Sequence, residues 1–455
     1  MGLFFGSLYL VATFVRPQEL FTVLSPYNTM DILAGLALGG AVLDMAVGRS
    51  RPVLLPQSVL LAVFVAWAAL TVVLALQWLG GAWMAFEQLS ISAFVFLVLI
   101  LTGTGMARLK VLSGVLLVSM LGLTTLGLHA YFKGGQWEQS LVLQDRREQA
   151  ARAEGSTPIE ENNDIQEAAE STSPLAGWLG GGDRRRRLRG LGFLNDPNDL
   201  SQVLVAFIPL AFLGWRRRRH VGNLAFVVLP VSVFLYATWL SRSRGALIAL
   251  AALIGFALSA RYAGRLSRVI DAVGWAGLLT MLVALFRLGL ADESAEGRRE
   301  AWSEGFSMLR SSPIWGAGFG GFGDRDRVAH NSFVHCFGEL GLVGYGLWLG
   351  AILITLHQLD ALRRLDSSTA EQAELSRWGG ALRLSLLSFL VSSLFLSRTY
   401  SPTLFLLLGL PAALVGVAWA RGQRVGPSPL PFVVEVGAAT LGTVIVAYVV
   451  TRLSW

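Results

Sequence analysis

Apolar runs long enough to cross a lipid bilayer recur along this chain and limit the folds that it can adopt. Hydrophobic residues make up 54% of the 455 residues and charged residues only 15%, against about 25% in soluble domains. A helix of about 20 apolar residues spans the hydrocarbon core. Because these runs are longer than barrel strands and apolar on all sides, they predict helices. We therefore predict an all-α, polytopic transmembrane bundle of about 12–13 spans.

The predicted spans divide the chain into five parts. They cover residues 3–15, 28–47, 53–78, 84–106, 110–130, 197–215, 221–240, 244–262, 268–290, 332–356, 378–397, 401–420 and 431–453. The five parts are N-terminal transmembrane helices, an extracytoplasmic loop, central transmembrane helices, a second extracytoplasmic loop and C-terminal transmembrane helices, at 1–130, 131–196, 197–290, 291–331 and 332–455. Within the first loop, residues 144–173 are acidic and rich in Ser and Thr, and this composition predicts a flexible insertion without chemistry.

Short basic loops predict the orientation of the bundle. They alternate onto one face, at 48–52, 107–110, 215–220, 261–268, 363–377 and 421–424. Positive loops favour the cytoplasm, so the two long polar loops and the turns `SRSRG` and `SRTYS` should lie on the extracytoplasmic face. The amino terminus then lies inside and the carboxyl terminus outside, a result that changes if the first or last segment does not cross.

Arginines on the extracytoplasmic face run against this charge rule. The run `RRRRLR` includes Arg187 and Arg189 and comes shortly before a helix start at `NDPND`, where Asp196 and Pro197 form an ordinary cap and first turn. The arginines at 184–186 are equally well explained as solvated loop charges. A cationic cluster at a helix start on this face also favours an anionic ligand.

A second arginine pair and two further stretches lie on the same predicted face. Arg242 and Arg244 occupy the tight turn `SRSRG`, either as interface arginines that snorkel or as ligand contacts. Arg398 and Tyr400 lie in `SRTYSP`, where a helix-turn role is the default interpretation. Arg298 opens the third stretch, residues 296–333.

The third stretch combines an amphipathic pattern with a glycine-rich string. Trp302, Phe306 and Leu309 recur at helical spacing, which predicts a helix lying on the bilayer or capping a cavity. The glycine-rich string `GAGFGGFG` predicts a flexible loop. Its G-x-G-x-x-G pattern does not indicate a dinucleotide site, because no strand precedes it. Asp324 and Asp326 could hold a divalent metal, but the neighbouring arginines favour self-neutralised loop charges.

His330 is the best candidate for acid–base chemistry. It stands where a span begins with `HNSFVHCFGELG`, and imidazole exchanges a proton near neutral pH. A capping or stacked histidine is the structural alternative. Asn331 and Glu339 are expected to support it indirectly, and Glu339, inside an apolar run, should pair with His335 or an arginine.

Several arginines and one histidine at one face suit a phosphate ligand, because the planar guanidinium fork matches phosphate oxygens. Free nucleotides are scarce outside the cytoplasm, so a lipid-linked diphosphate is the natural ligand. The predicted chemistry is group transfer, in which arginines stabilise charge on the leaving diphosphate. We expect no metal, no cofactor and no nucleic acid. Membrane lipids are expected partners.

The motif order resembles a known family. The runs `RGLGFLNDPND`, `SRGALIAL`, `SPIWGAGFGGF` and `HNSFVHCFGELGLVG` occur in the order typical of the bacterial O-antigen ligase and polymerase family. The early `FVRPQELFTVLSP` is similar to the exosortase-associated O-glycosylation ligase subgroup. The resemblance covers residues 185–345 well and the remainder through span topology only.

The resemblance implies an inner-membrane glycosyltransferase of the GT-C type that moves glycan from undecaprenyl diphosphate to an acceptor hydroxyl at the periplasmic face, by a metal-independent, inverting mechanism. By motif position, Arg189, Arg244 and Arg298 would hold the diphosphate and His330 would be the catalytic base. Arg187, Arg242 and Arg299 are neighbours that could take over these roles.

Three alternatives remain at this point. The acceptor is a lipid or a glycan, so a polymerase is nearly as well supported as a ligase. A transporter or flippase of lipid-linked glycan would favour charge deep in the bundle and an internal repeat, neither of which the sequence displays. A metal-dependent enzyme would use Asp324 and Asp326. The oligomeric state stays open.

Overall fold

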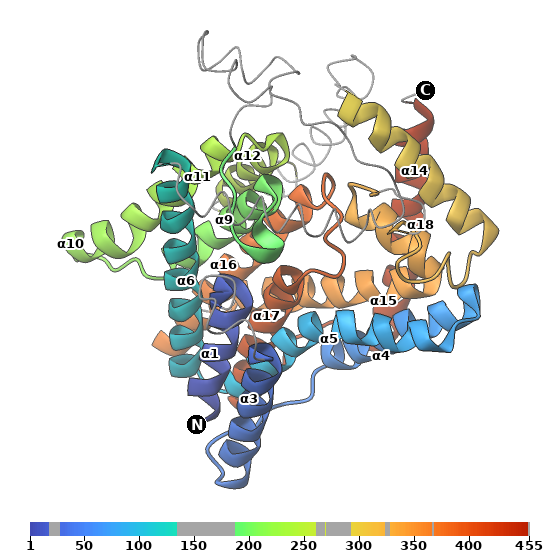
Figure 1. Ribbon diagram of the computed structural model, residues 1–455. Coiled ribbons are helices and arrows are strands. Elements are labelled where there is room, and N and C mark those ends of the chain that lie inside the picture. The colour runs from blue at the N-terminus through green and yellow to red at the C-terminus, as the bar shows by residue number, and fades with distance from the viewer. Residues whose placement is uncertain are drawn as a thin grey trace, which may run out of the picture.

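The protein is an all-helical bundle (Figure 1). The computed structural model describes residues 1–17, 28–133, 187–260, 269, 293–323, 328–365 and 368–453, and these contain no β-strand. The helices are α1 (Gly2–Val15), α3 (Thr29–Ala46), α4 (Pro56–Leu76), α5 (Leu79–Thr102), α6 (Met106–Lys133), α9 (Pro197–Phe212), α10 (His220–Asn223), α11 (Leu229–Ser241), α12 (Arg244–Ser259), α14 (Glu293–Ser311), α15 (Ser332–Arg363), α16 (Ala370–Ser392), α17 (Pro402–Ala420) and α18 (Pro429–Leu453), with a 3-10 turn η2 (Gly192–Leu194) and a π-helical turn η3 (Leu224–Val228).

Eight of these helices are long and apolar enough to cross a membrane, counting α10, η3 and α11 as one run. They are α3, α4, α5, α6, the α10–α11 run, α15, α17 and α18. The other predicted spans coincide with α1, α9 and α12, which are shorter, and with α16, whose first half is charged. The segment 268–290 lies outside the described residues except for residue 269. The fold-class prediction, a polytopic helical membrane protein, is confirmed.

The first segment reaches from one end of the bundle to the other in spite of its length. At its start, the amino group of Met1 pairs with Asp44 at 3.1 Å. Gly2 and Gly40 let the backbones of α1 and α3 approach closely, since a Cβ on Gly2 would lie 2.9 Å from Ala41 Cα. After its last residue, the side chain of Arg16 lies directly over Gly192, at the opposite end of the bundle.

Three of the six loops that were predicted to share one face, 107–110, 363–377 and 421–424, are joined by ion pairs to one another or to the end of α3. Arg108 pairs with Asp44 at 3.2 Å. Lys110 pairs with Glu374 at 2.6 Å, and Arg421 lies 3.9 Å from Glu371. These contacts join the ends of α3, α6, α16 and α17, and we call this the basic-loop end. The other end, where α9, α12 and α15 begin, is called the site end.

The centre of the bundle is formed by α9 and α17, which are almost wholly buried. Asp196 caps α9 by accepting a hydrogen bond from Asn198 N at 2.6 Å, and Pro197 occupies the first turn. Gln202 on α9 donates to Ser393 Oγ on the segment after α16, at 3.0 Å. Such interhelical hydrogen bonds fix neighbouring helices where no water can compete.

Helix α15 is broken at Gly341, whose φ of 64° is in the left-handed region. The break frees backbone groups, and the glycine-rich segment 316–323 with its flanks satisfies them. Ala317 N donates to Gly338 O and Gly318 N to Glu339 O, both at 2.9 Å, and Leu342 N donates to Pro313 O at 2.8 Å. The predicted flexible glycine loop is therefore wrong: the segment is hydrogen-bonded against α15.

The predicted amphipathic helix is present as α14 and covers the site end beside the last turns of α18 (Figure 1). Trp302 and Leu309 are buried, and the Phe306 ring contacts Phe337 of α15 and Tyr448 of α18, at centroid distances of 5.1 and 5.5 Å. Gly305 allows a close approach to Val334 of α15. The apolar stripe thus packs onto two helices of the bundle.

Candidate functional site

The first arginines of the site lie on the extended segment before η2. Leu188 between them is buried and donates its N–H to Leu240 O at 3.3 Å, which ties the segment to the end of α11. Gly127 of α6 approaches Arg189 O so closely that a Cβ would lie 2.8 Å from it. Arg187 is half-buried: its Nε donates to Ser241 O at 2.8 Å and its Nη2 to Asn198 Oδ1 at 3.0 Å. Arg189 is exposed.

The tight turn between α11 and α12 carries the second pair. Arg242 adopts a left-handed φ of 52°, and Ser243 caps α12 by accepting from Ala246 N at 3.3 Å. Arg244, the first residue of α12, is exposed. The carbonyl of Ser241 that starts this turn is the one that Arg187 binds. The turn therefore holds Arg242 and Arg244 beside the first segment.

Helix α14 contributes Arg298 one turn before Trp302. The guanidinium is half-buried, and its Nε is buried without a hydrogen-bond partner among the described residues. Trp302 donates its indole N–H to Ala329 O at 3.1 Å. This bond fastens the chain directly before His330, so α14 supplies one cation and also holds the histidine's backbone.

His330 sits at a strained, exposed position between two fixed neighbours. Its φ is 49°, in the left-handed region, whereas Ala329 and Asn331 are buried. Asn331 caps α15, accepting from Phe333 N at 2.9 Å and from Val334 N at 3.2 Å. The predicted supporting role of Asn331 thus has a concrete form in this cap. A strained backbone held on both sides is typical of functional positions.

Charges at the site end act on one another through neighbouring residues. Although its side chain reaches solvent, partial burial lowers the pKa of His330, and the charge of Arg298 lowers it further. Burial also lowers the pKa of Arg298, with a contribution from Arg244.

Arg187 is the point where the arginine segments meet. Burial lowers the pKa of its guanidinium most, and the charges of Arg189, Arg242 and Arg244 lower it too. Asp196 acts in the opposite direction on both Arg187 and His330. Guanidinium groups stay charged under such influences. The structure therefore gathers six predicted site residues at one end of the bundle: Arg187, Arg189, Arg242, Arg244, Arg298 and His330.

Glu339 lies deeper, in the part of α15 before the break. It is buried and accepts two hydrogen bonds, from Phe322 N at 3.2 Å and from Tyr400 Oη at 2.8 Å, and its carboxylate lies 3.2 Å from His335 Nε2. Of the two predicted partners, His335 is the one observed. Glu339 thereby joins α15 to the glycine-rich segment and to Tyr400, a structural role that supports the helix on which His330 is mounted.

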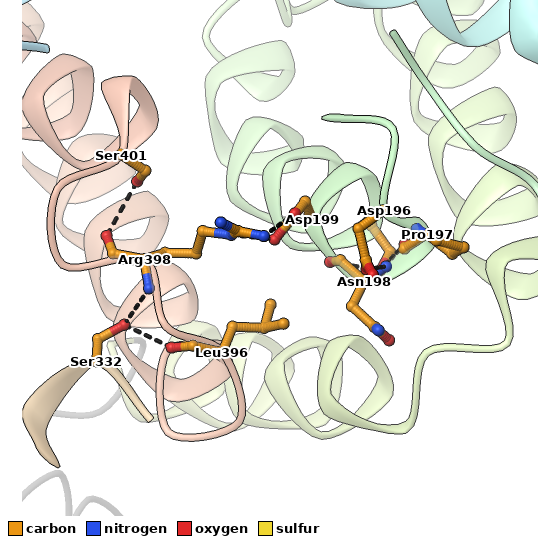
Figure 2. Close-up of polar contacts among 9 residues, drawn as sticks. Asp196, Pro197, Asn198, Asp199, Ser332, Leu396, Arg398 and Ser401 are labelled. Atoms are coloured by element: carbon orange, nitrogen blue, oxygen red, sulfur yellow. Dashed lines mark hydrogen bonds and ion pairs between the residues drawn. The ribbon is translucent and has the colours of Figure 1, made fainter. Parts of the chain in front are cut away.

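Sequence analysis gave Arg398 only a helix-turn role, and the structure places it in the site. Its guanidinium pairs with Asp199 in the first turn of α9 (Figure 2), and its charge also lowers the pKa of His330. The two residues stand far apart in the sequence, and Asp199 reads as part of the `NDPND` helix start. The only available signal was that `SRTYSP` shares the predicted face.

The remaining predictions concern residues that the structure does not describe or does not connect. The arginines at 184–186, Asp324, Asp326 and the whole acidic insertion at 144–173 lie outside the described residues. Among the described residues, no group of three or more His, Cys, Asp or Glu side chains could hold a metal ion. Arg299 is half-buried on α14 next to Arg298.

Comparison with known proteins matches one region of the chain, which includes part of the candidate site. Curated proteins gave no match to this chain. Residues 231–349 match the family model described as O-Antigen ligase. The matched region contains the α11–α12 turn, α14, His330 and Glu339, while Arg187, Arg189 and Arg398 lie outside it. Through residues 231–349, the match supports an O-antigen ligase-like family for this polytopic membrane protein, of the ligase or polymerase type of membrane glycosyltransferase.

Proposed function

We propose that the site end binds the diphosphate of a lipid-linked glycan and transfers the glycan to an acceptor hydroxyl. The observation that carries the proposal is a series of neighbouring cations that ends at His330: Arg189, Arg242 and Arg244 act on Arg187, Arg244 acts on Arg298, and Arg298 acts on His330. Cations that lie close together attract an anion. A diphosphate offers two groups whose oxygens match arginine forks.

The donor is undecaprenyl diphosphate carrying a glycan. Its tail stays in the bilayer while its diphosphate lies at the membrane surface, the level at which α9, α12 and α15 begin. Arginine forks match phosphate oxygens. The buried Nε of Arg298, for which the described part of the chain supplies no hydrogen-bond acceptor, provides a preformed donor that a ligand oxygen would satisfy.

His330 is the general base of the transfer. Its lowered pKa keeps the imidazole neutral near pH 7, the form that accepts a proton. The acceptor oxygen attacks the anomeric carbon, its proton passes to His330, and the bond between that carbon and the diphosphate oxygen breaks. Arginines stabilise the charge that develops on the departing diphosphate. This single displacement inverts the anomeric configuration and involves no metal.

The site belongs on the periplasmic face of a bacterial inner membrane. The support is the contact pattern of the two ends: basic loops gather at one end, and positive loops favour the cytoplasm. A ligase would deliver the glycan to a lipid acceptor and a polymerase to another lipid-linked glycan. We favour the ligase slightly.

The test is glycan transfer in vesicles that contain the purified full chain and labelled undecaprenyl-diphosphate glycan. Arg298→Ala should reduce transfer on the order of 10- to 100-fold, the effect of losing one charge-assisted contact. Arg310→Ala, which removes an exposed arginine near the end of the same helix, is the matched control and should leave transfer unchanged.

The same assay separates the alternatives. Movement of the labelled lipid across the vesicle membrane without covalent transfer would identify a transporter and contradict the proposal. Transfer that stops in the presence of a chelator would contradict the metal-free mechanism. Products with repeated glycan units would identify a polymerase within the same chemistry, and a single transfer to a lipid would identify a ligase.

A further inference from the structure

An ion pair joins two elements of the site end that sequence analysis did not connect. Arg398, in the segment between α16 and α17, directs its guanidinium at Asp199 in the first turn of α9, with Nε on one carboxylate oxygen and Nη2 on the other (Figure 2). The side chain of Asp199 is 3% exposed and that of Arg398 is 36% exposed. The pair thus hides its carboxylate and presents its cation to solvent.

The guanidinium is only partly used by this pairing. Arginine has five N–H donors in a fixed fork. Asp199 accepts from Nε and from one N–H of Nη2, and among the described residues no partner is present for Nη1. Because Asp199 fixes one edge of the fork, the rest of the planar group is oriented before any ligand binds.

The backbone of Arg398 is fastened to the start of the helix that carries His330. Arg398 N donates to Ser332 Oγ at 2.8 Å, and Ser332 Oγ donates to Leu396 O at 2.6 Å (Figure 2). Thr399 Oγ1 donates to Ser332 O at 2.8 Å. Ser332 follows His330 by two residues, so the cation and the imidazole are held on one framework.

Helix α9 connects this framework to the arginine segment. Asn198 accepts a hydrogen bond from Arg187, and its neighbour Asp199 accepts two from Arg398. One helical turn therefore sets the positions of two arginines that come from opposite sides of the site. Electrostatics agrees with this geometry, since the charge of Arg398 acts on His330.

We propose that Arg398 is a further anion-binding residue of this site and that Asp199 is the positioning residue that orients its fork. The proposal rests on the proposed function, because the ligand group is a phosphoryl oxygen. That oxygen belongs either to the donor diphosphate or to an anionic group on the acceptor. A buried carboxylate that fixes an arginine lowers the entropy lost when the arginine binds a ligand.

The experiment measures binding of inorganic pyrophosphate to the purified full chain in nanodiscs. Arg398→Ala should weaken binding on the order of 10- to 100-fold, the effect of losing hydrogen bonds to a charged group. Arg398→Lys keeps the charge and loses the fork, so it should restore binding only in part. Arg310→Ala is the matched control and should bind as the wild type does.

Asp199→Asn tests the positioning role separately. The variant keeps an oxygen for one hydrogen bond and removes the charge that fixes the fork. Pyrophosphate binding should change less than in Arg398→Ala, whereas the rate of glycan transfer at saturating donor should fall, because a loosened group misplaces the leaving diphosphate. If the ion pair is purely structural, both variants should lose thermal stability alike. Neither variant should then change the transfer rate relative to pyrophosphate affinity.

Each outcome bears on the proposal. Wild-type pyrophosphate affinity in Arg398→Ala overturns it; if that variant does not fold, unchanged affinity in Arg398→Lys overturns it as well. A raised KM for the donor identifies the diphosphate as the ligand, and a raised KM for the acceptor identifies the acceptor's anionic group.

If Arg298→Ala weakens pyrophosphate binding while both Arg398 variants bind normally, the proposed function stands and only this inference fails. A wild-type chain that binds no pyrophosphate and transfers no glycan overturns both.

Discussion

At the scale of single residues, the site is built from charges that the membrane environment disfavours. Arg187 and Arg242 were recognisable in the sequence because they contradict the orientation rule of the loops around them, and Arg298 because of its position in a family-like motif. Arg398 was not, because a lone arginine in a helix turn has an ordinary explanation. Its partner Asp199 is identified only by the fold, which brings α9 against the segment after α16.

At the residue scale, His330 should make glycan transfer depend on pH. Burial and the charge of Arg298 hold its pKa below the ordinary value of about 6.5, which favours the neutral imidazole. Transfer should therefore be independent of pH near neutrality and fall as pH drops through this lowered pKa. Arg298→Ala removes one of the charges, so the acid limb of its profile should move to higher pH. Identical limbs in kcat/KM profiles of the two proteins would show that Arg298 does not act on the base.

At the scale of elements, apolar periodicity located the helices, but it could not locate the break in α15. The spans were predictable because each is a continuous run, and α14 because Trp302, Phe306 and Leu309 follow a helical spacing. Gly341 is one of 50 glycines, and its role depends on hydrogen bonds from the segment 316–323, a tertiary feature. The same segment reads as a flexible loop when only its composition is considered.

Gly341 should therefore tolerate no side chain. Its backbone, at φ 64° and ψ −171°, lies in a region that is essentially restricted to glycine, and a Cβ would lie 2.3 Å from Ile314 O. Gly341→Ala should lower stability by about 1–3 kcal/mol and reduce transfer. Gly346→Ala, on the same helix, places its Cβ 3.7 Å from the nearest atom and is the control. Equal thermal unfolding midpoints in the two variants would mean that the break is not maintained in solution.

At the scale of the whole molecule, the bundle has two chemically different ends. Ion pairs of Asp44, Glu371 and Glu374 hold the basic-loop end together, while Arg187 and the arginines that act on it gather at the site end. Which end faces the cytoplasm follows from the charge rule and stays a prediction. That loops 107–110, 363–377 and 421–424 lie at one end was predictable from their charge, since the alternation of loops depends only on the order of the spans.

Cysteine labelling tests this orientation. Cys336 is the single cysteine and is buried, so it can be left in place as a silent background. Arg310→Cys, at an exposed position near the end of α14, should react with a membrane-impermeant maleimide added to the periplasmic side. Arg217→Cys, in the exposed loop after α9, should react only after the membrane is permeabilised. The reverse pattern would place the site end in the cytoplasm.

The measurement that tests the central claim most directly compares His330→Ala with the wild type for two quantities, donor binding and glycan transfer. A cationic site with one base predicts that His330→Ala binds the undecaprenyl-diphosphate glycan as tightly as the wild type, while its transfer rate falls on the order of 100- to 10,000-fold. Transfer by His330→Ala at the wild-type rate would contradict the account, because it would show that the arginines bind a ligand on which His330 does no chemistry.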